Sequence, residues 1–181
     1  HSASSVALVG GGGDPRPVKS GASLFLRRVD TLVDKQLEGI GADALKLRGR
    51  AGVALAKLAY REYQKTFRSN TFGALAASGA QPQFMLWAST GTKNSAYSDV
   101  LYVESLIGAE TINTVPDATL NAFRDHGKAE ATLESGMDDA QSHFDALAKA
   151  GVDMHQAGET LQAEGVKLFE QAFDQLLKLL A

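Results

Sequence analysis

The chain has 181 residues, of which 22% are charged and 44% hydrophobic, with a formal net charge of −3. That is enough apolar chain for one folded domain, and the near-neutral charge gives no electrostatic basis for general nucleic-acid or membrane-surface binding. The absence of cysteine excludes disulfide frameworks, thiolate metal sites and cysteine nucleophiles. No apolar run approaches the length of a membrane span, and the first residues lack the basic region of a signal peptide. We therefore expect a cytoplasmic protein.

Residues 1–19 are rich in serine, glycine and proline and predict a flexible lead-in, with the folded domain over 20–181. A short apolar run before Gly10 suggests a dinucleotide-binding loop. That fingerprint needs a third small residue where Pro15 stands, so the dinucleotide interpretation fails.

Apolar runs over 22–26, 84–88 and 111–115 predict three short buried strands. Between and after them, helical spacing of apolar residues predicts helices. The expected helices are 30–38, 43–67 with Asp43 as N-cap, 99–107, 117–123, 138–150 and 154–180.

Strands that alternate with helices indicate a parallel sheet. Three strands are few for such a sheet, and a closed (β/α)8 barrel typically needs about 250 residues. The sequence therefore predicts an α/β fold that is part of a barrel, or a subunit that completes one.

Polar residues follow the predicted strands, where α/β folds place ligands. Arg27 and Arg28 follow the first strand, and the segment 89–94 (Ser-Thr-Gly-Thr-Lys-Asn) follows the second. Hydroxyls, approachable backbone N–H groups and the charge of Lys93 suit a phosphate or carboxylate, although an ordinary capped loop fits equally well. The segment is not a Walker A loop, and Lys93 is poorly placed as a Schiff-base amine, which needs burial or neighbouring cations.

Other chemistry-bearing residues favour structural interpretations. The four histidines show no metal-ligand spacing, so no metal site is expected. Asp30 and Asp34 are interpreted as helix-surface charges, and the basic residues of 43–67 as a solvated face. Trp87 and the pair Tyr60 and Tyr63 are interpreted as packing residues.

Four segments resemble the transaldolase family, in the branch that carries RVDT and WAST-G-KN segments. They are ASLFLRRVDTLVDKQL (22–37), LKLRGRAGVALAKLAYREYQ (45–64), LWASTGTKNSAYSDVLYVESLIGAETINTVPDATLNAFRDHG (86–127) and GVKLFEQAFDQLLKLL (165–180). The resemblance covers about residues 20 to 181, and the segments agree in order and spacing.

The resemblance implies a (β/α)8 TIM barrel, of which this chain would be the last three strands and the closing helices. It implies transfer of a dihydroxyacetone unit between sugar phosphates of the pentose phosphate pathway through a lysine Schiff base, without metal or organic cofactor. The implied substrates are sedoheptulose 7-phosphate, fructose 6-phosphate, glyceraldehyde 3-phosphate and erythrose 4-phosphate.

The resemblance also assigns site residues. Arg28, Ser89 and Lys93 match positions that bind the substrate phosphate, and Ser23 and Phe25 match positions lining the substrate pocket. The family's lysine segment of I-K-[IV]-P-A-T type is absent, as are the earlier strands with their acidic residues, so no catalytic residue is assigned. Relatives usually carry a small residue where Arg27 stands.

Two functions from different classes follow. The chain is either the C-terminal, phosphate-binding half of a transaldolase, inactive alone, or a non-enzymatic sugar-phosphate-binding remnant or scaffold. A parent fused to an isomerase domain is a third interpretation. A part-barrel exposes sheet edges and apolar interior, so we expect self-association or pairing with an N-terminal half.

Overall fold

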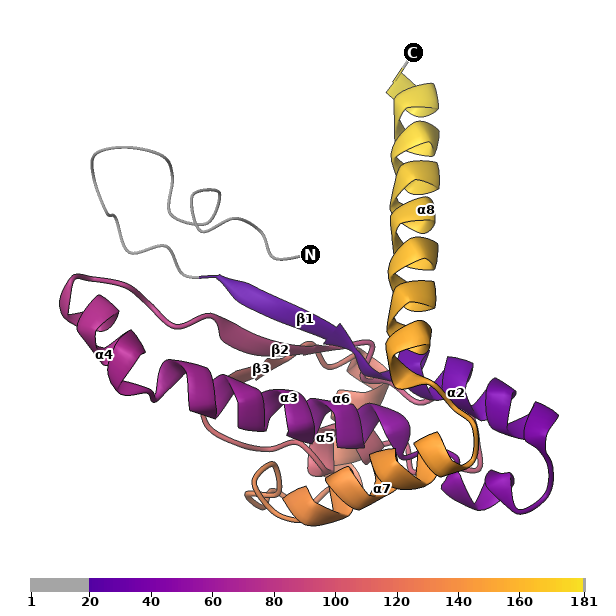
Figure 1. Cartoon of the computed structure of the whole chain (residues 1–181). Coiled ribbons are helices and arrows are strands. Elements are labelled where there is room, and N and C mark those ends of the chain that lie inside the picture. The colour runs from indigo at the N-terminus through magenta and orange to yellow at the C-terminus, as the bar shows by residue number, and fades with distance from the viewer. Residues whose placement is uncertain (1–19, 181) are drawn as a thin grey trace.

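The computed structural model describes residues 20–180 (Figure 1), so the predicted lead-in lies outside the described residues. The elements, in chain order, are β1 (Gly21–Phe25), α2 (Leu26–Ile40), the 3-10 helix η1 (Ala44–Leu47), α3 (Ala51–Phe67), α4 (Asn70–Ala77), β2 (Phe84–Ala88), α5 (Leu101–Glu104), β3 (Thr111–Asn113), α6 (Asp117–His126), α7 (Met137–Lys149) and α8 (Met154–Leu180). No helix between residues 20 and 180 is long and apolar enough to cross a membrane.

The three strands form one parallel sheet in the order β1-β2-β3, which confirms the predicted strands and their direction. The prediction that all three are buried is wrong, because only β2 is mostly covered. Ser23 lies beside Leu86, and Leu86 beside Ile112. Because the strands are parallel, the chain leaves all three at the same edge of the sheet. The start of α2 and the loop after β2 are thereby brought to this edge.

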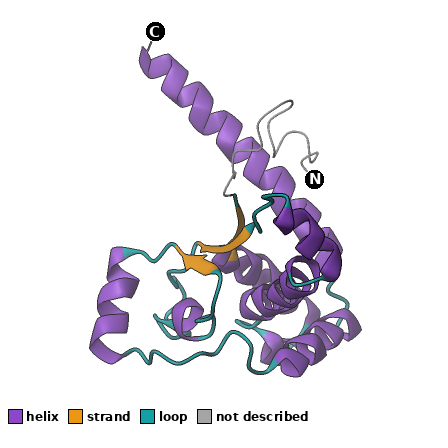
Figure 2. Ribbon diagram, turned by 90° about the vertical axis from the view of Figure 1, so that its left-hand side faces the viewer, coloured by secondary structure: helices purple, strands orange, loops and turns teal. Residues whose placement is uncertain are grey.

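Within residues 20–180, helices cover one face of the sheet and leave the other bare. Met85 and Trp87 are buried on that face, in a core with Tyr60 of α3 and Tyr102 of α5, and these helices lie on one side of the sheet (Figures 1 and 2). On the other face Phe25 is 39% and Ile112 47% exposed. Parallel sheets are normally covered on both faces. The bare apolar face is consistent with part of a barrel whose interior is incomplete.

The sheet also has two open edges. β1 pairs only with β2, and β3 pairs only with β2, so the outer edge of each has no strand partner among residues 20–180. Unpaired edge N–H and C=O groups are a template for further strands.

The predicted single helix over 43–67 is wrong. Gly49 has a φ of 68°, in the left-handed region, and it separates η1 from α3. The Asp43 carboxylate does not cap a helix but accepts a hydrogen bond from Lys46 Nζ at 2.7 Å. Helix α4 was not predicted; Ser69 caps it by accepting from the Phe72 amide at 3.1 Å. The predicted helix over 99–107 is only one turn, α5.

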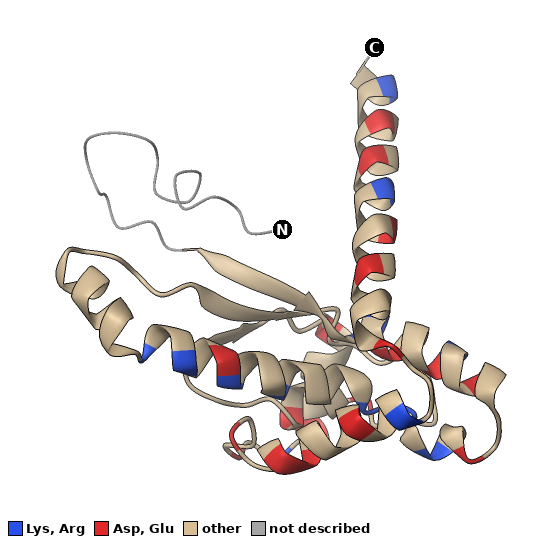
Figure 3. Ribbon diagram, viewed as in Figure 1, with Lys and Arg blue, Asp and Glu red and all other residues tan. Residues whose placement is uncertain are grey.

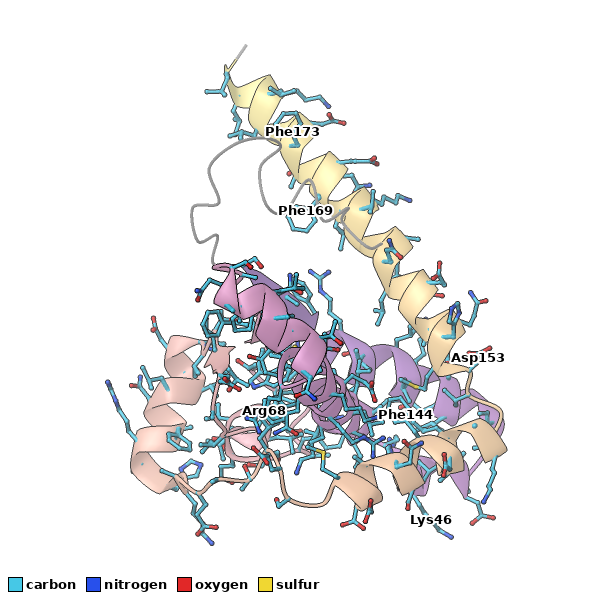
Figure 4. All side chains as sticks on the ribbon, turned by 60° about the vertical axis from the view of Figure 1, so that its left-hand side comes forward. Lys46, Arg68, Phe144, Asp153, Phe169 and Phe173 are labelled. Carbon is cyan, nitrogen blue, oxygen red and sulfur yellow. The ribbon has the colours of Figure 1, made fainter. Side chains whose placement is uncertain are left out.

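A second core joins α2, α3 and α7 around Val33, Leu37 and Leu147. The N-terminal end of α8 packs there through Met154 and Leu161. The helix then runs away from the body, and Phe169 and Phe173 on its far portion are 73% and 59% exposed (Figure 4).

Candidate phosphate-binding site

A cleft of about 930 Å³ opens at the sheet edge where the strands end. It lies between α2, the loop after β2, and α8. Its cationic side chains are Arg27, Arg28, Lys35 and Lys93, and its acidic side chains are Asp30, Asp34, Glu38 and Glu164. Elsewhere on the molecule, basic and acidic residues are interspersed, as along α3 and α8 (Figure 3).

Arg28 and Lys93 both line this cleft, although they follow different strands. Helix α2 begins at Leu26, earlier than predicted, so Arg28 stands in its first turn. The Arg28 guanidinium lies 4.8 Å from the centroid of the Phe25 ring, which orients its planar group. Neither Arg28 nor Lys93 forms an ion pair with a carboxylate of residues 20–180. Both charges are available to an anion.

The other predicted site residues lie near the cleft without lining it. Ser89 directly follows β2 and has a φ of 58°, which is uncommon for a residue other than glycine. Its carbonyl accepts a hydrogen bond from the Arg27 amide at 3.4 Å. Ser23 and Phe25 lie on the uncovered face of β1. The structure thus places Arg28 and Lys93 in the lining of one cleft and leaves Ser89, Ser23 and Phe25 outside that lining.

Two hydroxyls of the loop after β2 are already engaged within the protein. The buried Thr90 hydroxyl donates to the carbonyl of Thr114 at 3.1 Å, and the Thr92 hydroxyl donates to that of Ser98 at 3.1 Å. The Arg27 guanidinium donates to the Gly91 carbonyl at 3.4 Å. These groups hold the shape of the loop, so charge rather than threonine hydroxyls is what the cleft offers an anion.

The interpretation of Asp30 and Asp34 as helix-surface charges is wrong. Asp30 is 2% exposed, and its carboxylate accepts the Gly52 amide at 2.9 Å and the Tyr102 hydroxyl at 2.6 Å. The Asp34 carboxylate accepts the Gly49 amide at 2.9 Å and the Tyr97 hydroxyl at 2.6 Å. One helix face thereby ties together the start of α3, the loop after β2 and α5.

Burial raises the pKa of Asp30 above its usual value, and the hydrogen bonds from Tyr102 and Gly52 oppose that rise. Burial, with the neighbouring aspartates, also raises the pKa values of Tyr97 and Tyr102 well above their ordinary values. Both phenols therefore stay protonated as donors at physiological pH. The burial of Asp30 could have been predicted from the sequence, because Asp30 lies on the same helix face as the apolar residues Leu26, Val33 and Leu37.

Lys57 was predicted to lie on a solvated helix face, but its ammonium is bound within the protein. Its ammonium donates to the carbonyls of Thr132 at 2.9 Å and Ser135 at 2.6 Å, and burial lowers its pKa. It lines a separate cavity of about 480 Å³ together with His143. Among residues 20–180 no cluster of three histidine or acidic side chains could hold a metal ion. Trp87, Tyr60 and Tyr63 are buried in the core, as predicted.

A family model described as transaldolase/fructose-6-phosphate aldolase matches residues 2–180. The chain belongs to this family. The transaldolase family has the TIM-barrel fold, with which the small parallel sheet and its bare face are consistent.

Curated transaldolases are similar along most of the chain. The transaldolase of Thiobacillus denitrificans is 56% identical over 167 residues, which are 92% of this chain and 46% of that protein. The Neisseria meningitidis serogroup A protein is 49% identical over 86% of this chain and 43% of its own length. The Mycolicibacterium smegmatis protein is 47% identical over 92% of this chain and 45% of its own length. The chain thus spans just under half the length of these relatives, their C-terminal half.

Proposed function

We propose that the chain is the phosphate-binding half of a transaldolase, which transfers a dihydroxyacetone unit between sugar phosphates in the cytoplasm. The proposed substrates are sedoheptulose 7-phosphate, fructose 6-phosphate, glyceraldehyde 3-phosphate and erythrose 4-phosphate. The observation that carries the proposal is that Arg28 and Lys93 line one cleft, at the ends of neighbouring parallel strands. Similarity to transaldolases over most of the chain supports the same reaction.

The cleft suits a phosphate for two reasons. The planar Arg28 guanidinium can donate two parallel hydrogen bonds to phosphate oxygens, and Lys93 adds a compact positive charge. Two of the acids that line the cleft, Asp30 and Asp34, already accept two hydrogen bonds each, which reduces their repulsion of an anion. Ser89, at the start of the same loop, is the third proposed phosphate ligand, and Ser23 and Phe25 are proposed for the sugar pocket.

The covalent step needs an amine other than the two that line the cleft, because Lys93 is proposed to bind the phosphate and Lys35 is exposed on α2. A Schiff base forms from a lysine whose pKa is depressed. Burial lowers the pKa of Lys57, but its ammonium is bound to two carbonyls and does not line the cleft. We therefore assign the Schiff base to a lysine of the partner half, with no metal or organic cofactor.

The partner is proposed to be an N-terminal half of the same barrel. The uncovered sheet face, with Phe25 and Ile112, and the open edges of β1 and β3 are the surfaces that further strands would cover. Covering them places the catalytic lysine inside the barrel, next to the cleft.

Borohydride trapping with fructose 6-phosphate tests this assignment. The chain alone should not be labelled, and mixing with a separately expressed N-terminal half of a close relative should restore labelling on that half and sugar-phosphate transfer. Labelling of Lys93 would overturn the role given to it.

Variants locate the phosphate site. Arg28→Met and Lys93→Met should each raise the dissociation constant for fructose 6-phosphate at least tenfold, because each removes a charge-assisted contact. Lys149→Met, at an exposed position of α7, is the matched control and should change it little. Retained phosphate binding that no N-terminal half converts into catalysis would favour the inactive remnant.

A further inference from the structure

The side chains of Asp34 and Tyr97 join the loop that carries Lys93 to the helix that carries Arg28, and we propose that this pair positions the two cations for a single phosphate. The inference rests on the proposed function and extends it to residues that do not touch the substrate. Asp34 and Arg28 belong to α2, whereas Tyr97 and Lys93 belong to the loop between β2 and α5.

The pair connects the second half of the loop to α2. The Tyr97 hydroxyl donates to Asp34 Oδ2 at 2.6 Å, across 63 residues of sequence. Arg27 ties only the beginning of the loop, through Ser89 and Gly91. Among the described residues, no other hydrogen bond links residues 92–99 to α2. Lys93 therefore lies between two attachments to α2, the Arg27 contacts before it and the bond of Tyr97 to Asp34 after it.

The loop transmits this anchor to Lys93 because its turn is compact. The Asn94 side chain accepts the Ala96 amide at 2.9 Å, and the Asn94 carbonyl accepts the Tyr97 amide at 3.1 Å. Residues 94–97 are thus closed on themselves directly after Lys93. Fixing the Tyr97 ring fixes the end of the segment that carries the lysine.

The other end of the pair is held equally well. Asp34 Oδ1 accepts the Gly49 amide at 2.9 Å, so the carboxylate is bound on both oxygens. Gly49 also makes room for the phenol, because a Cβ there would lie 2.6 Å from two Tyr97 ring atoms. The turn before α3 therefore accommodates the Tyr97 ring and leaves it little freedom.

The pair also controls the charge of the cleft. Asp34 and Tyr97 line the cleft with Arg28 and Lys93, and a free carboxylate there would repel a phosphate and attract the cations. The hydroxyl of Tyr97 occupies one carboxylate oxygen. Its removal should both loosen the loop and expose negative charge to the anion.

The experiment is a double-mutant cycle on the full 181-residue chain, read as the dissociation constant for fructose 6-phosphate by calorimetry. Tyr97→Phe should raise that constant roughly tenfold, the effect of about one strong hydrogen bond. In a Lys93→Met background, Tyr97→Phe should have a clearly smaller effect, since there is no lysine to position and only the exposed charge of Asp34 remains to weaken binding. Asp34→Asn, which keeps a hydrogen-bonding partner for the phenol, should bind better than Asp34→Ala.

Tyr63→Phe is the matched control, because the Tyr63 hydroxyl is buried without a hydrogen-bond partner among the described residues. It should leave phosphate binding unchanged. Thermal unfolding of each variant shows whether it is folded. A Tyr97→Phe variant that is less stable but binds as the wild type would overturn the positioning role, as would full additivity with Lys93→Met.

The two proposals fail in different ways. If Arg28→Met and Lys93→Met do not weaken binding, or the wild type does not bind, the proposed function fails and the positioning role with it. If both weaken binding and Tyr97→Phe does not, only the positioning role fails.

Discussion

The hydroxyl of Tyr102 donates to the carboxylate of Asp30 at 2.6 Å, across 72 residues of sequence and inside the core. Asp30 and Tyr102 connect α2 to α5, and through the Gly52 amide Asp30 also connects α2 to α3. A buried carboxylate is tolerated only when its oxygens are satisfied. This bond therefore holds α2, and with it Arg28, in place at the sheet edge.

Removing that donor should destabilise the fold. Tyr102→Phe leaves Asp30 with one fewer hydrogen bond, and we expect the free energy of unfolding at pH 7 to fall by about 1–3 kcal/mol. Urea unfolding followed by circular dichroism measures the change. Tyr63→Phe, whose hydroxyl has no partner among the described residues, should cost much less. Equal losses in the two variants would contradict the role of the Tyr102 bond.

Two helical glycines should respond to alanine in opposite ways. A Cβ at Gly52 would lie 2.7 Å from the Leu26 carbonyl oxygen and 2.9 Å from Asp30 Oδ2, so Gly52→Ala should force α2 and α3 apart. We expect a loss of about 1–3 kcal/mol in the free energy of unfolding. Gly73 in α4 has no neighbouring atom within 4 Å of such a Cβ, and Gly73→Ala should be neutral or stabilising by up to about 1 kcal/mol. Similar effects at both positions would show that α2 and α3 are not closely packed.

Acid should destabilise the protein through His143. This histidine is 4% exposed, neither ring nitrogen has a partner among the described residues, and burial, with Arg50 nearby, lowers its pKa. A histidine whose folded-state pKa lies below the unfolded value of about 6.5 stabilises the fold above that value. The stabilisation is lost as the pH falls from about 6.5 through the folded-state pKa.

His143→Leu should therefore flatten the fall in thermal midpoint between pH 7 and pH 5. His126→Gln is the informative comparison, because hydrogen bonds to Asp99 and Asp125 raise the pKa of His126. Its contribution is present at low pH and is lost as the pH rises through the raised pKa, so this substitution should steepen the acid loss slightly. A pH profile unchanged by His143→Leu would mean that His143 is solvated in the native protein.

Much of the sheet could be predicted because short apolar runs at 22–26, 84–88 and 111–115 favour strands, although only the run at 84–88 is buried in this chain. The arrangement of Arg28 and Lys93 at one cleft also follows from strand direction, since parallel strands end at the same edge. The predicted start of α2 is too late because two arginines directly after a strand suggest a polar break in the chain. In the structure Arg27 and Arg28 belong to the first turn of the helix and line the cleft.

The parts that could not be predicted depend on contacts distant in sequence. Gly49 divides a strongly helical segment because the Tyr97 ring occupies the space beside it. The sequence suggests that Asp30 and Asp34 are surface charges because their phenol donors lie more than 60 residues away, Tyr97 in a loop and Tyr102 in the short helix α5. The sequence suggests that the hydroxyls of Thr90 and Thr92 could donate to an anion. In the structure they donate instead to the carbonyls of Thr114 and Ser98.

The chain alone should self-associate. Phe25 and Ile112 on the bare sheet face, and Phe169 and Phe173 on α8, are large apolar side chains at the surface, and exposed apolar surface of this kind favours association. Sedimentation velocity should show dimers or larger species that dissociate on dilution.

The paired substitution Phe169→Glu with Phe173→Glu should reduce association through α8. The control pair Gln162→Glu with Gln171→Glu adds the same charge without removing apolar surface and should have less effect. An N-terminal half that completes the barrel should compete with association through the sheet, because it covers the same face. A cooperative monomer at all concentrations would contradict both the exposed interior and the need for a partner.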